Sequence, residues 1–239
     1  MDYRTHEIGA PENSFWFKSR QDLLTVFFGK LPPMTAGASQ RSILNIGSGT
    51  GHDLQVMQQY GKLHVMDIEP RAIELIPDNL VHEKRVGDVR NISYGDNTFD
   101  VVVTCDMLEH VDNDVQAVKE ILRVLKPGGY LIFTVPAFNS IYSGHDRDML
   151  HHRRYNKSMA RVLFRDFKKV ELGYWFCTLF PAAAAHRLYH RNDAKQSPYV
   201  LPAILDKGVY AALKLENWLI SKGVKLPFGL SLYGIYQKP

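Results

Sequence analysis

Short runs of apolar, β-branched residues recur along the chain and alternate with stretches of helical periodicity. The runs cover residues 42–46, 63–67, 99–104 and 130–135. Each is typical of a strand that is buried on both faces of a parallel sheet. Between the last two runs, a helical pattern that starts at residue 114 ends at the Pro-Gly-Gly triplet of residues 127–129, and its apolar face consists of Val115, Val118, Ile121, Leu122 and Leu125. The alternation predicts a doubly wound α/β sheet, in which ligands bind at the carboxyl ends of the strands.

The C-terminal third adds helical patterns between the last two predicted strands. These strands cover residues 170–176 and 230–239, which leaves an insertion of roughly fifty residues. The insertion carries helical patterns at residues 180–191 and 201–223, and the second has an apolar stripe made of Leu201, Ile204, Leu205, Val209, Leu213 and Trp218. The stripe could pack on the sheet, wall a site for an apolar ligand, form a dimer interface or contact a membrane surface. Periodicity does not choose among these.

Composition limits the class of protein. With 239 residues, 45% of them apolar, the chain can bury a sizeable core as one large domain or as one domain with an added lobe. Its two cysteines, Cys105 and Cys177, lie in apolar surroundings, as reduced core thiols do. There is no apolar leader and no run of about 18 apolar residues, so we expect a soluble, cytoplasmic protein without a transmembrane segment. A net charge of +4 is too small to indicate nucleic acid as a partner.

A glycine-rich stretch, LNIGSGTG, extends from the first apolar run. Gly47, Gly49 and Gly51 let a ligand approach the main chain closely. The helical pattern that starts at Thr50 would point its N-terminus at an anionic or polar group. A dinucleotide fingerprint would place its third glycine at position 52, where this chain has His52. A nucleotide-dependent dehydrogenase is therefore disfavoured.

Acidic residues follow the next two predicted strands. Asp67 ends the run at residues 63–67, where a carboxylate can accept hydrogen bonds from both hydroxyls of a ribose. Asp88 follows a strand pattern at residues 84–87, where a carboxylate can accept a hydrogen bond from an adenine amino group. Each acid alone could equally be a loop residue or a helix cap. Acids at successive strand ends, together with the glycine loop, favour a binding site at this edge of the sheet.

Four stretches resemble the ordered motifs of class I S-adenosylmethionine-dependent methyltransferases of the type 11 subgroup. They are LNIGSGTG, HVMDIEP, GDVRNISYGDNTFDVVVTCDMLEHVDN and LKPGGYLIFTVP, and they fall within residues 40–137. The resemblance implies a seven-stranded Rossmann-like sheet and S-adenosylmethionine as the cofactor. It says little about the acceptor.

The resemblance also implies where the cofactor binds. The glycine loop would lie against its methionine part, Asp67 would hold its ribose, Asp88 and Val89 would border its adenine, and Cys105 would lie beside the sulfonium. Residues 12–24, ENSFWFKSRQDLL, resemble an N-terminal lid helix that covers the cofactor with aromatic side chains and binds its carboxylate with an arginine, although the aromatics could equally be core residues. The cofactor-binding candidates are Trp16, Arg20, Gly47, Ser48, Gly49, Gly51, Asp67, Ile68, Asp88, Val89 and Cys105.

The stretch CDMLEH contains a candidate metal set. Asp106, Glu109 and His110 have the spacing i, i+3, i+4, which puts them on one face of a helical turn. The set resembles that of metal-using quinone O-methyltransferases, whose acidic and histidine residues fall in the same segment. A Leu-Glu-His at this place is also widespread in the wider family as a structural element. We therefore expect no metal ion here.

Positive charge is concentrated after the fifth predicted strand. Residues 145–169 hold eight Lys or Arg and three His against three Asp. The stretch SGHDRDMLHHRRYNKSM resembles the HD…H·RRY segment of bacterial methyltransferases found with glycan, lipid-linked or natural-product pathways. In this fold, residues after the fifth strand lie over the cofactor pocket, so the segment is the expected acceptor site. The catalytic candidates are His145, His151, Arg154 and Tyr155.

These residue types suggest separate roles. A histidine can take a proton from a hydroxyl near neutral pH, and an arginine can clamp a carboxylate or phosphate with two hydrogen bonds. As the base, His145 is slightly favoured over His151 because it lies nearer the strand end. A solvated basic surface is the expected role of the remaining arginines, Arg147, Arg153, Arg161 and Arg165.

Together these patterns predict one methyltransferase domain over residues 1–239. It would consist of an N-terminal lid and linker (1–40), a cofactor-binding core (41–137) and an acceptor-side segment with a helical cap (138–239). The expected reaction is O-methylation of a carboxylate or hydroxyl on a small-molecule, glycan- or lipid-linked, or natural-product acceptor. N-methylation, or a non-catalytic methyltransferase-fold protein that supports a partner, is the alternative. Peripheral membrane contact and the oligomeric state stay open.

Overall fold

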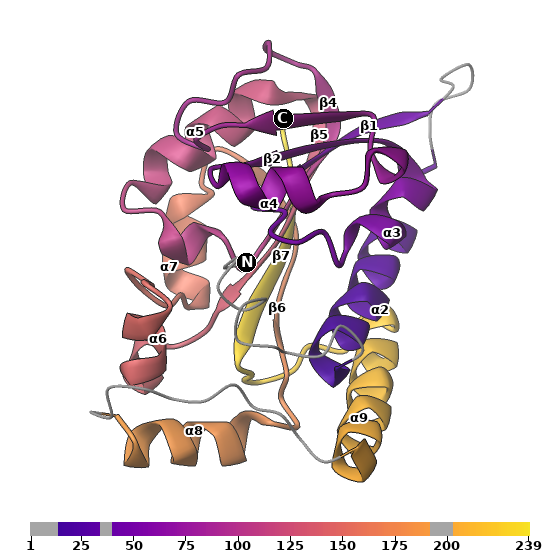
Figure 1. The fold of residues 1–239 in the computed structure, drawn as a ribbon. Helices are drawn as coiled ribbons and strands as arrows, with labels where there is room; N and C mark the ends of the chain where they lie inside the picture. Colours follow the sequence, from indigo (N-terminus) through magenta and orange to yellow (C-terminus); the bar gives the residue numbers. More distant parts are fainter. Residues whose placement is uncertain (1–13, 34–39, 192–202) are drawn as a thin grey trace.

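A seven-stranded sheet forms the centre of the molecule. The computed structural model describes residues 14–33, 40–191 and 203–239. The strands lie in the order β3-β2-β1-β4-β5-β7-β6 (Figure 1), with β1 to β5 parallel and β7 antiparallel to both of its neighbours. Their bounds are β1 (Arg41–Ile46), β2 (Gly61–Asp67), β3 (Glu83–Val86), β4 (Phe99–Cys105), β5 (Leu125–Pro136), β6 (Lys168–Trp175) and β7 (Ser231–Gln237). The predicted doubly wound, seven-stranded sheet is confirmed.

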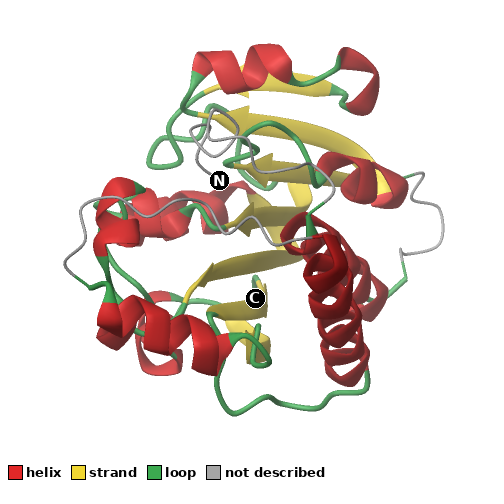
Figure 2. Ribbon diagram, turned by 60° about the horizontal axis from the view of Figure 1, so that its bottom comes forward, coloured by secondary structure: helices red, strands yellow, loops and turns green. Residues whose placement is uncertain are grey.

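Helices cover both faces of this sheet (Figure 2). Their bounds are α2 (Phe15–Lys30), α3 (Leu54–Met57), α4 (Pro70–Leu75), α5 (Asp114–Val124), α6 (Gly144–Asp148), α7 (Lys157–Leu163), α8 (Phe180–Tyr189) and α9 (Ala203–Ser221). Successive residues of a strand point to opposite faces of the sheet, so each buried strand contributes side chains to a hydrophobic core on either face. In β1, Leu44 and Ile46 join the core under α5 and α7, whereas Ile43 joins the core under α2 and α9.

The predicted helical insertion lies between β6 and β7 and contains α8 and α9. Helix α9 packs beside α2, as both views show (Figures 1 and 2). The contact is partly polar, because Asn217 donates a hydrogen bond to the carbonyl of Ser19 at 2.8 Å and accepts one from the indole of Trp175 at 2.8 Å. Within the described residues, no helix is both long and apolar enough to cross a bilayer.

Two helix boundaries differ from the expectation. The helix expected from Thr50 begins at Leu54 instead, because the positive φ of Gly51, 84°, belongs to a turn rather than a helix. Helix α5 ends at Val124, and the strand β5 starts at once at Leu125, so the residues before the Pro-Gly-Gly triplet already pair with β4. Of the N-terminal lid and linker expected at residues 1–40, residues 1–13 and 34–39 lie outside the described residues.

Candidate functional site

A cleft of about 540 Å³ lies at the carboxyl ends of β1, β2 and β3. This is the edge at which doubly wound sheets bind ligands, and the volume is in the range of small-molecule sites. Residues from the loop after β4 and from the segment 149–152 complete its wall. Of the sequence candidates, those in the wall are Gly47, Asp67, Ile68, Asp88 and Val89.

The glycine loop connects β1 to the short helix α3 beside this cleft. Gly47, Gly49 and Gly51 have φ angles of 73°, 51° and 84°. Residues other than glycine rarely adopt this region of backbone conformation. The hydroxyl of Ser48 is buried and has no hydrogen-bond partner within the described part of the chain. Buried polar groups are normally satisfied, so an unpaired hydroxyl in this loop fits the binding of a polar ligand.

Asp67 fixes the far end of the loop and borders the cleft. Its Oδ2 accepts a hydrogen bond from the Gly49 amide at 2.9 Å, and its Oδ1 accepts one from the Glu69 amide at 3.0 Å. Each carboxylate oxygen can accept two hydrogen bonds, so both oxygens keep acceptor capacity. A carboxylate held in this way suits a pair of adjacent hydroxyls, such as those of a ribose.

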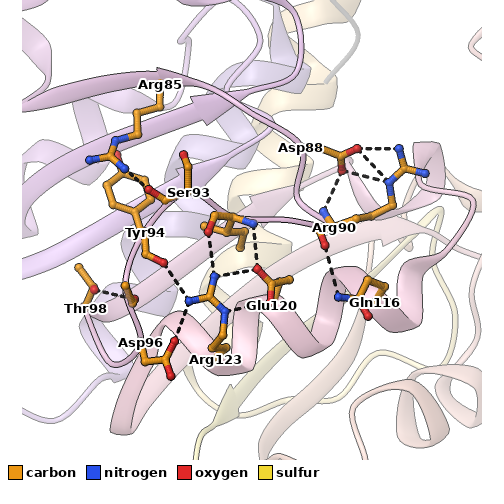
Figure 3. Close-up of polar contacts among 12 residues, drawn as sticks. Arg85, Asp88, Arg90, Ser93, Tyr94, Asp96, Thr98, Gln116, Glu120 and Arg123 are labelled. Atoms are coloured by element: carbon orange, nitrogen blue, oxygen red, sulfur yellow. Dashed lines mark hydrogen bonds and ion pairs between the residues drawn. The ribbon is translucent and has the colours of Figure 1, made fainter.

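Asp88 is bound by its neighbour Arg90, as Figure 3 shows. The Arg90 side chain donates to Asp88 at 2.6 to 3.1 Å, and the Arg90 amide donates to Oδ1 at 2.8 Å. These hydrogen bonds hold the pKa of Asp88 below its usual value. Arg90 thus donates hydrogen bonds to both oxygens, and the expected contact of Asp88 and Val89 with an adenine stays a prediction.

Helix α2 brings the lid residues to the ends of β4 and β6. Trp16 stacks on Phe176 with ring centroids 4.4 Å apart. Arg20 is 1% exposed, its Nε lies 2.8 Å from Asp53 Oδ2, and its Nη1 lies 3.3 Å from Asp106 Oδ2. Neither Trp16 nor Arg20 borders the cleft. Arg20 instead lies between two acids, Asp53 and Asp106, and its expected contact with the cofactor carboxylate stays a prediction.

Cys105, the last residue of β4, lies near this arginine. The thiol is buried, and burial raises its pKa to about 12, so it stays protonated. Cys105 packs in the core on the side of the sheet that α2 and α9 cover, and its expected place beside the sulfonium stays a prediction.

The acceptor segment is organised around Asp146, a residue that the sequence candidates do not include. Asp146 is fully buried and accepts hydrogen bonds from His151 Nδ1 at 3.0 Å, Arg154 Nε at 2.7 Å and Arg187 Nη1 at 3.2 Å. Burial opposes its charge, but these partners hold its pKa well below the usual range. In the sequence, Ser143 and Asp146 form the S-x-x-D pattern of a helix N-terminus. This pattern predicts that Asp146 caps a helix, but it does not predict the contacts with His151, Arg154 and Arg187.

The four catalytic candidates differ in what they can reach. His151 and Arg154 meet at Asp146, and Arg154 also donates to the carbonyl of Ala137 at 3.1 Å while being 2% exposed. Tyr155 donates to Asp114 at 2.8 Å, and burial raises the pKa of its hydroxyl. Arg154 and Tyr155 are therefore held inside the protein, whereas His151 keeps one ring nitrogen that Asp146 does not use.

The structure does not bring the three residues of the candidate metal set, Asp106, Glu109 and His110, to one place. Asp106 turns to Arg20 and accepts a hydrogen bond from Thr134 at 3.2 Å. Glu109 and His110 instead meet His151, and one potential ligand atom from each lies within 4.8 Å of the others. Oε2 of Glu109 is buried without a hydrogen-bond partner among the described residues, and burial raises the pKa of this carboxyl group well above its usual value. A buried carboxyl group with a raised pKa is consistent with the structural role expected for this segment, and the prediction that it holds no metal stays a prediction.

Two partly buried histidines, His110 and His145, are expected to lower the stability of the protein on acidification from pH 7 to pH 5. Burial lowers the pKa of His110 to about 3 and that of His145 to about 4, so below about pH 6.5 the unfolded chain binds more protons than the folded one. The free energy of unfolding should therefore fall by roughly 1–2 kcal/mol per histidine at pH 5. Urea unfolding at pH 7, 6 and 5 measures this. His145→Gln should reduce the pH dependence, the exposed control His82→Gln should keep it, and equal slopes for all three proteins would contradict the assignment.

Comparison with known proteins supports one family. A family model described as a methyltransferase domain matches residues 44–133. The chain is 33% identical over 108 residues to the 2-methyl-6-phytyl-1,4-hydroquinone methyltransferase of Synechocystis sp., which covers 43% of this chain and 32% of that protein. It is 32% identical over 107 residues to the norajmaline N-methyltransferase of Rauvolfia serpentina, which covers 38% of this chain and 35% of that protein. The chain thus spans about a third of the length of these relatives.

Solved structures extend the likeness of fold to nearly the whole chain. One chain of the Haloferax volcanii complex that contains the Trm112 methyltransferase activator aligns with 95% of this chain and 91% of its own length, at a TM-score of 0.61 and 16% identity. At that identity the likeness concerns the fold alone. Residues 44–133 thus match a methyltransferase domain, and the sequence motifs and the sheet order agree with a class I S-adenosylmethionine-dependent methyltransferase.

Proposed function

We propose that the protein transfers a methyl group from S-adenosylmethionine to a carboxylate or hydroxyl oxygen of a small-molecule, glycan- or lipid-linked, or natural-product acceptor. When bound, the cofactor supplies a strongly electrophilic sulfonium methyl group. The protein then has mainly to hold and align the reactants and to exclude water. The cleft supports this proposal, because Gly47, Asp67 and Val89 offer a glycine loop, a carboxylate and an apolar contact to such a molecule. The unpaired hydroxyl of Ser48 lies in the same loop.

The hydrogen bond between His151 and Asp146 carries the acceptor part of the proposal. Since Asp146 is ionised, His151 Nδ1 must be the donor in their 3.0 Å hydrogen bond, and the lone pair of the neutral ring is then on Nε2. In this role Nε2 takes the proton of an acceptor hydroxyl while the oxygen receives the methyl group. The buried carboxylate of Asp146 stabilises the imidazolium that results, as in other carboxylate–histidine pairs.

We therefore favour His151 over His145 as the catalytic base. The sequence slightly favours His145, but burial and the nearby Arg187 lower the pKa of His145 to about 4, which makes it a weak base. In this proposal Arg154 is a positioning residue, because its hydrogen bonds to Asp146 and to the carbonyl of Ala137 hold its guanidinium group in the protein interior. It holds the carboxylate that orients His151, in place of the anion clamp expected from the sequence.

Two alternatives have some support. The match to an N-methyltransferase favours transfer to nitrogen, for which the same histidine would remove a proton from an ammonium group. The fold shared with a chain of an activator complex favours a protein that acts with or for a partner.

Transfer of isotope-labelled methyl groups tests the proposal. Incubation with methyl-labelled S-adenosylmethionine and a fractionated metabolite extract is expected to label a product, and mild base should release methanol if that product is a methyl ester. A label retained as an N-methyl group would establish the nitrogen alternative instead. Calorimetry with S-adenosylhomocysteine reports on the cofactor site separately: binding without transfer to any fraction would favour the partner role, and absence of binding would contradict the whole proposal.

A further inference from the structure

Helix α9 turns one side toward α2 and the other toward solvent. On the inner side Leu213, Glu216, Asn217 and Ile220 are buried. On the outer side Ile204, Leu215 and Trp218 are 85%, 58% and 54% exposed. The stripe predicted from the sequence is therefore divided, with Leu213 in the core and Ile204 and Trp218 outside, while Leu201 lies outside the described residues.

The outer residues form a continuous band along the helix. Ile204 and Ala211 are seven residues apart, Ala211 and Leu215 four, and Ala211 and Trp218 seven, and these spacings place side chains one above the other. Ala211 is exposed between the larger residues. Among residues 14–33, 40–191 and 203–239, no segment covers this band, so the helix exposes its apolar groups to water there, and such contiguous surfaces mark interaction sites.

The charges of α9 are sorted between its two sides. Asp206 accepts a hydrogen bond from the Phe15 amide at 3.1 Å, and the buried Glu216 accepts hydrogen bonds from Cys177 and Thr178. Both acids are thus used within the protein. The exposed charged residues of α9 and of the turn that follows it are lysines only, namely Lys207, Lys214, Lys222 and Lys225.

We propose that the outer side of α9 rests on an anionic membrane surface. Ile204, Leu215 and Trp218 would enter the headgroup region, and Lys207 and Lys214, which lie along one edge of the band, would meet the lipid phosphates. An apolar helix face that contains tryptophan and is edged by lysines has the composition of an interfacial helix. Tryptophan favours the boundary between headgroups and acyl chains, and the lysine stems can cover apolar surface while the ammonium groups stay in water.

The charge pattern favours a lipid surface over a second copy of the chain. A two-fold dimer through this face would bring like-charged lysines from the two copies together, because each copy offers the same patch. An anionic bilayer attracts them instead. The inference goes beyond the proposed reaction and does not depend on it, since membrane binding can be measured without cofactor or acceptor.

Sedimentation with lipid vesicles tests the proposal. The protein is expected to sediment with vesicles that contain about 30% phosphatidylglycerol in phosphatidylcholine, to stay in solution with phosphatidylcholine alone, and to be released by high salt, because salt screens the lysines. The fluorescence of Trp218 should shift to shorter wavelength on binding; Trp175 is buried and Trp16 stacks on Phe176, so both are expected to change less.

Three variants separate the apolar and the charged contributions. The double variants Leu215→Ser/Trp218→Ser and Lys207→Glu/Lys214→Glu should each lower the vesicle partition coefficient at least about tenfold. Val162→Ser, which alters a valine on α7 that is 66% exposed, should leave it unchanged. Circular dichroism and thermal melting check that these surface changes leave the fold intact.

Three results would overturn the proposal. One is the absence of sedimentation with anionic vesicles, and another is undiminished binding by both double variants. The third is a dimer in analytical ultracentrifugation that Leu215→Ser/Trp218→Ser dissociates, since a second copy would then cover this face.

Discussion

Replacing His151 by alanine is expected to lower turnover by roughly a hundredfold or more, the usual size of a general-base contribution. Cofactor affinity should stay within about twofold of the parent, because His151 does not border the cleft that holds the cofactor candidates. Single-turnover rates with the identified acceptor, together with calorimetry of S-adenosylhomocysteine, measure the two effects separately. Added imidazole should restore part of the activity if the lost group is a proton acceptor.

Two matched variants separate proton acceptance from positioning. Asp146→Asn keeps the shape of the carboxylate but removes its charge, so it should lower turnover about tenfold or more without rescue by imidazole. His145→Ala should cost much less than His151→Ala. If the His151 variant turns over at the parental rate, the base lies elsewhere or the acceptor is already ionised, as a carboxylate is.

Asp67→Ala should weaken cofactor binding at least about tenfold. The carboxylate offers charge-assisted hydrogen bonds worth roughly 1.5–3 kcal/mol each to the ribose hydroxyls, before water compensates part of the loss. Calorimetry with S-adenosylhomocysteine measures the change directly. An affinity within about twofold of the parent would remove Asp67 from the site.

Because Asp67 also accepts the Gly49 and Glu69 amides, a control must separate ligand contact from loop support. Asp67→Asn retains one acceptor oxygen and so some support for the loop, and it should bind with intermediate affinity. Ser48→Ala removes only the unpaired hydroxyl, and a measurable loss there would place the loop itself against the ligand.

Strands were predictable because burial on both faces leaves a signal in consecutive residues. In β4, residues 101–105 are all buried, and the sequence VVVTC shows this without any knowledge of neighbours. Helix starts were less accessible. The turn at Gly51 and the late start of α3 depend on backbone angles. A glycine in the sequence permits a positive φ but does not predict that it occurs.

The acceptor side could be predicted only in part, since its geometry depends on residues far apart in the sequence. Arg187 of α8 reaches Asp146 across 41 positions, and this contact helps to make Asp146 a buried anion that orients His151. No local pattern contains that information. The pairing of Asp88 with Arg90, by contrast, spans two residues and was open to sequence reasoning.

The insertion that holds α8 and α9 departs from the sheet after Trp175 and returns at Ser231, and these two residues pair with each other across β6 and β7. An inserted segment whose two ends already touch behaves as a cassette, because its length changes the cost of closure only slowly. Exchange of the cassette would alter Arg187, which supports the acceptor segment, and the outer side of α9, as long as the new segment keeps the buried contacts of α9 with α2 and β6.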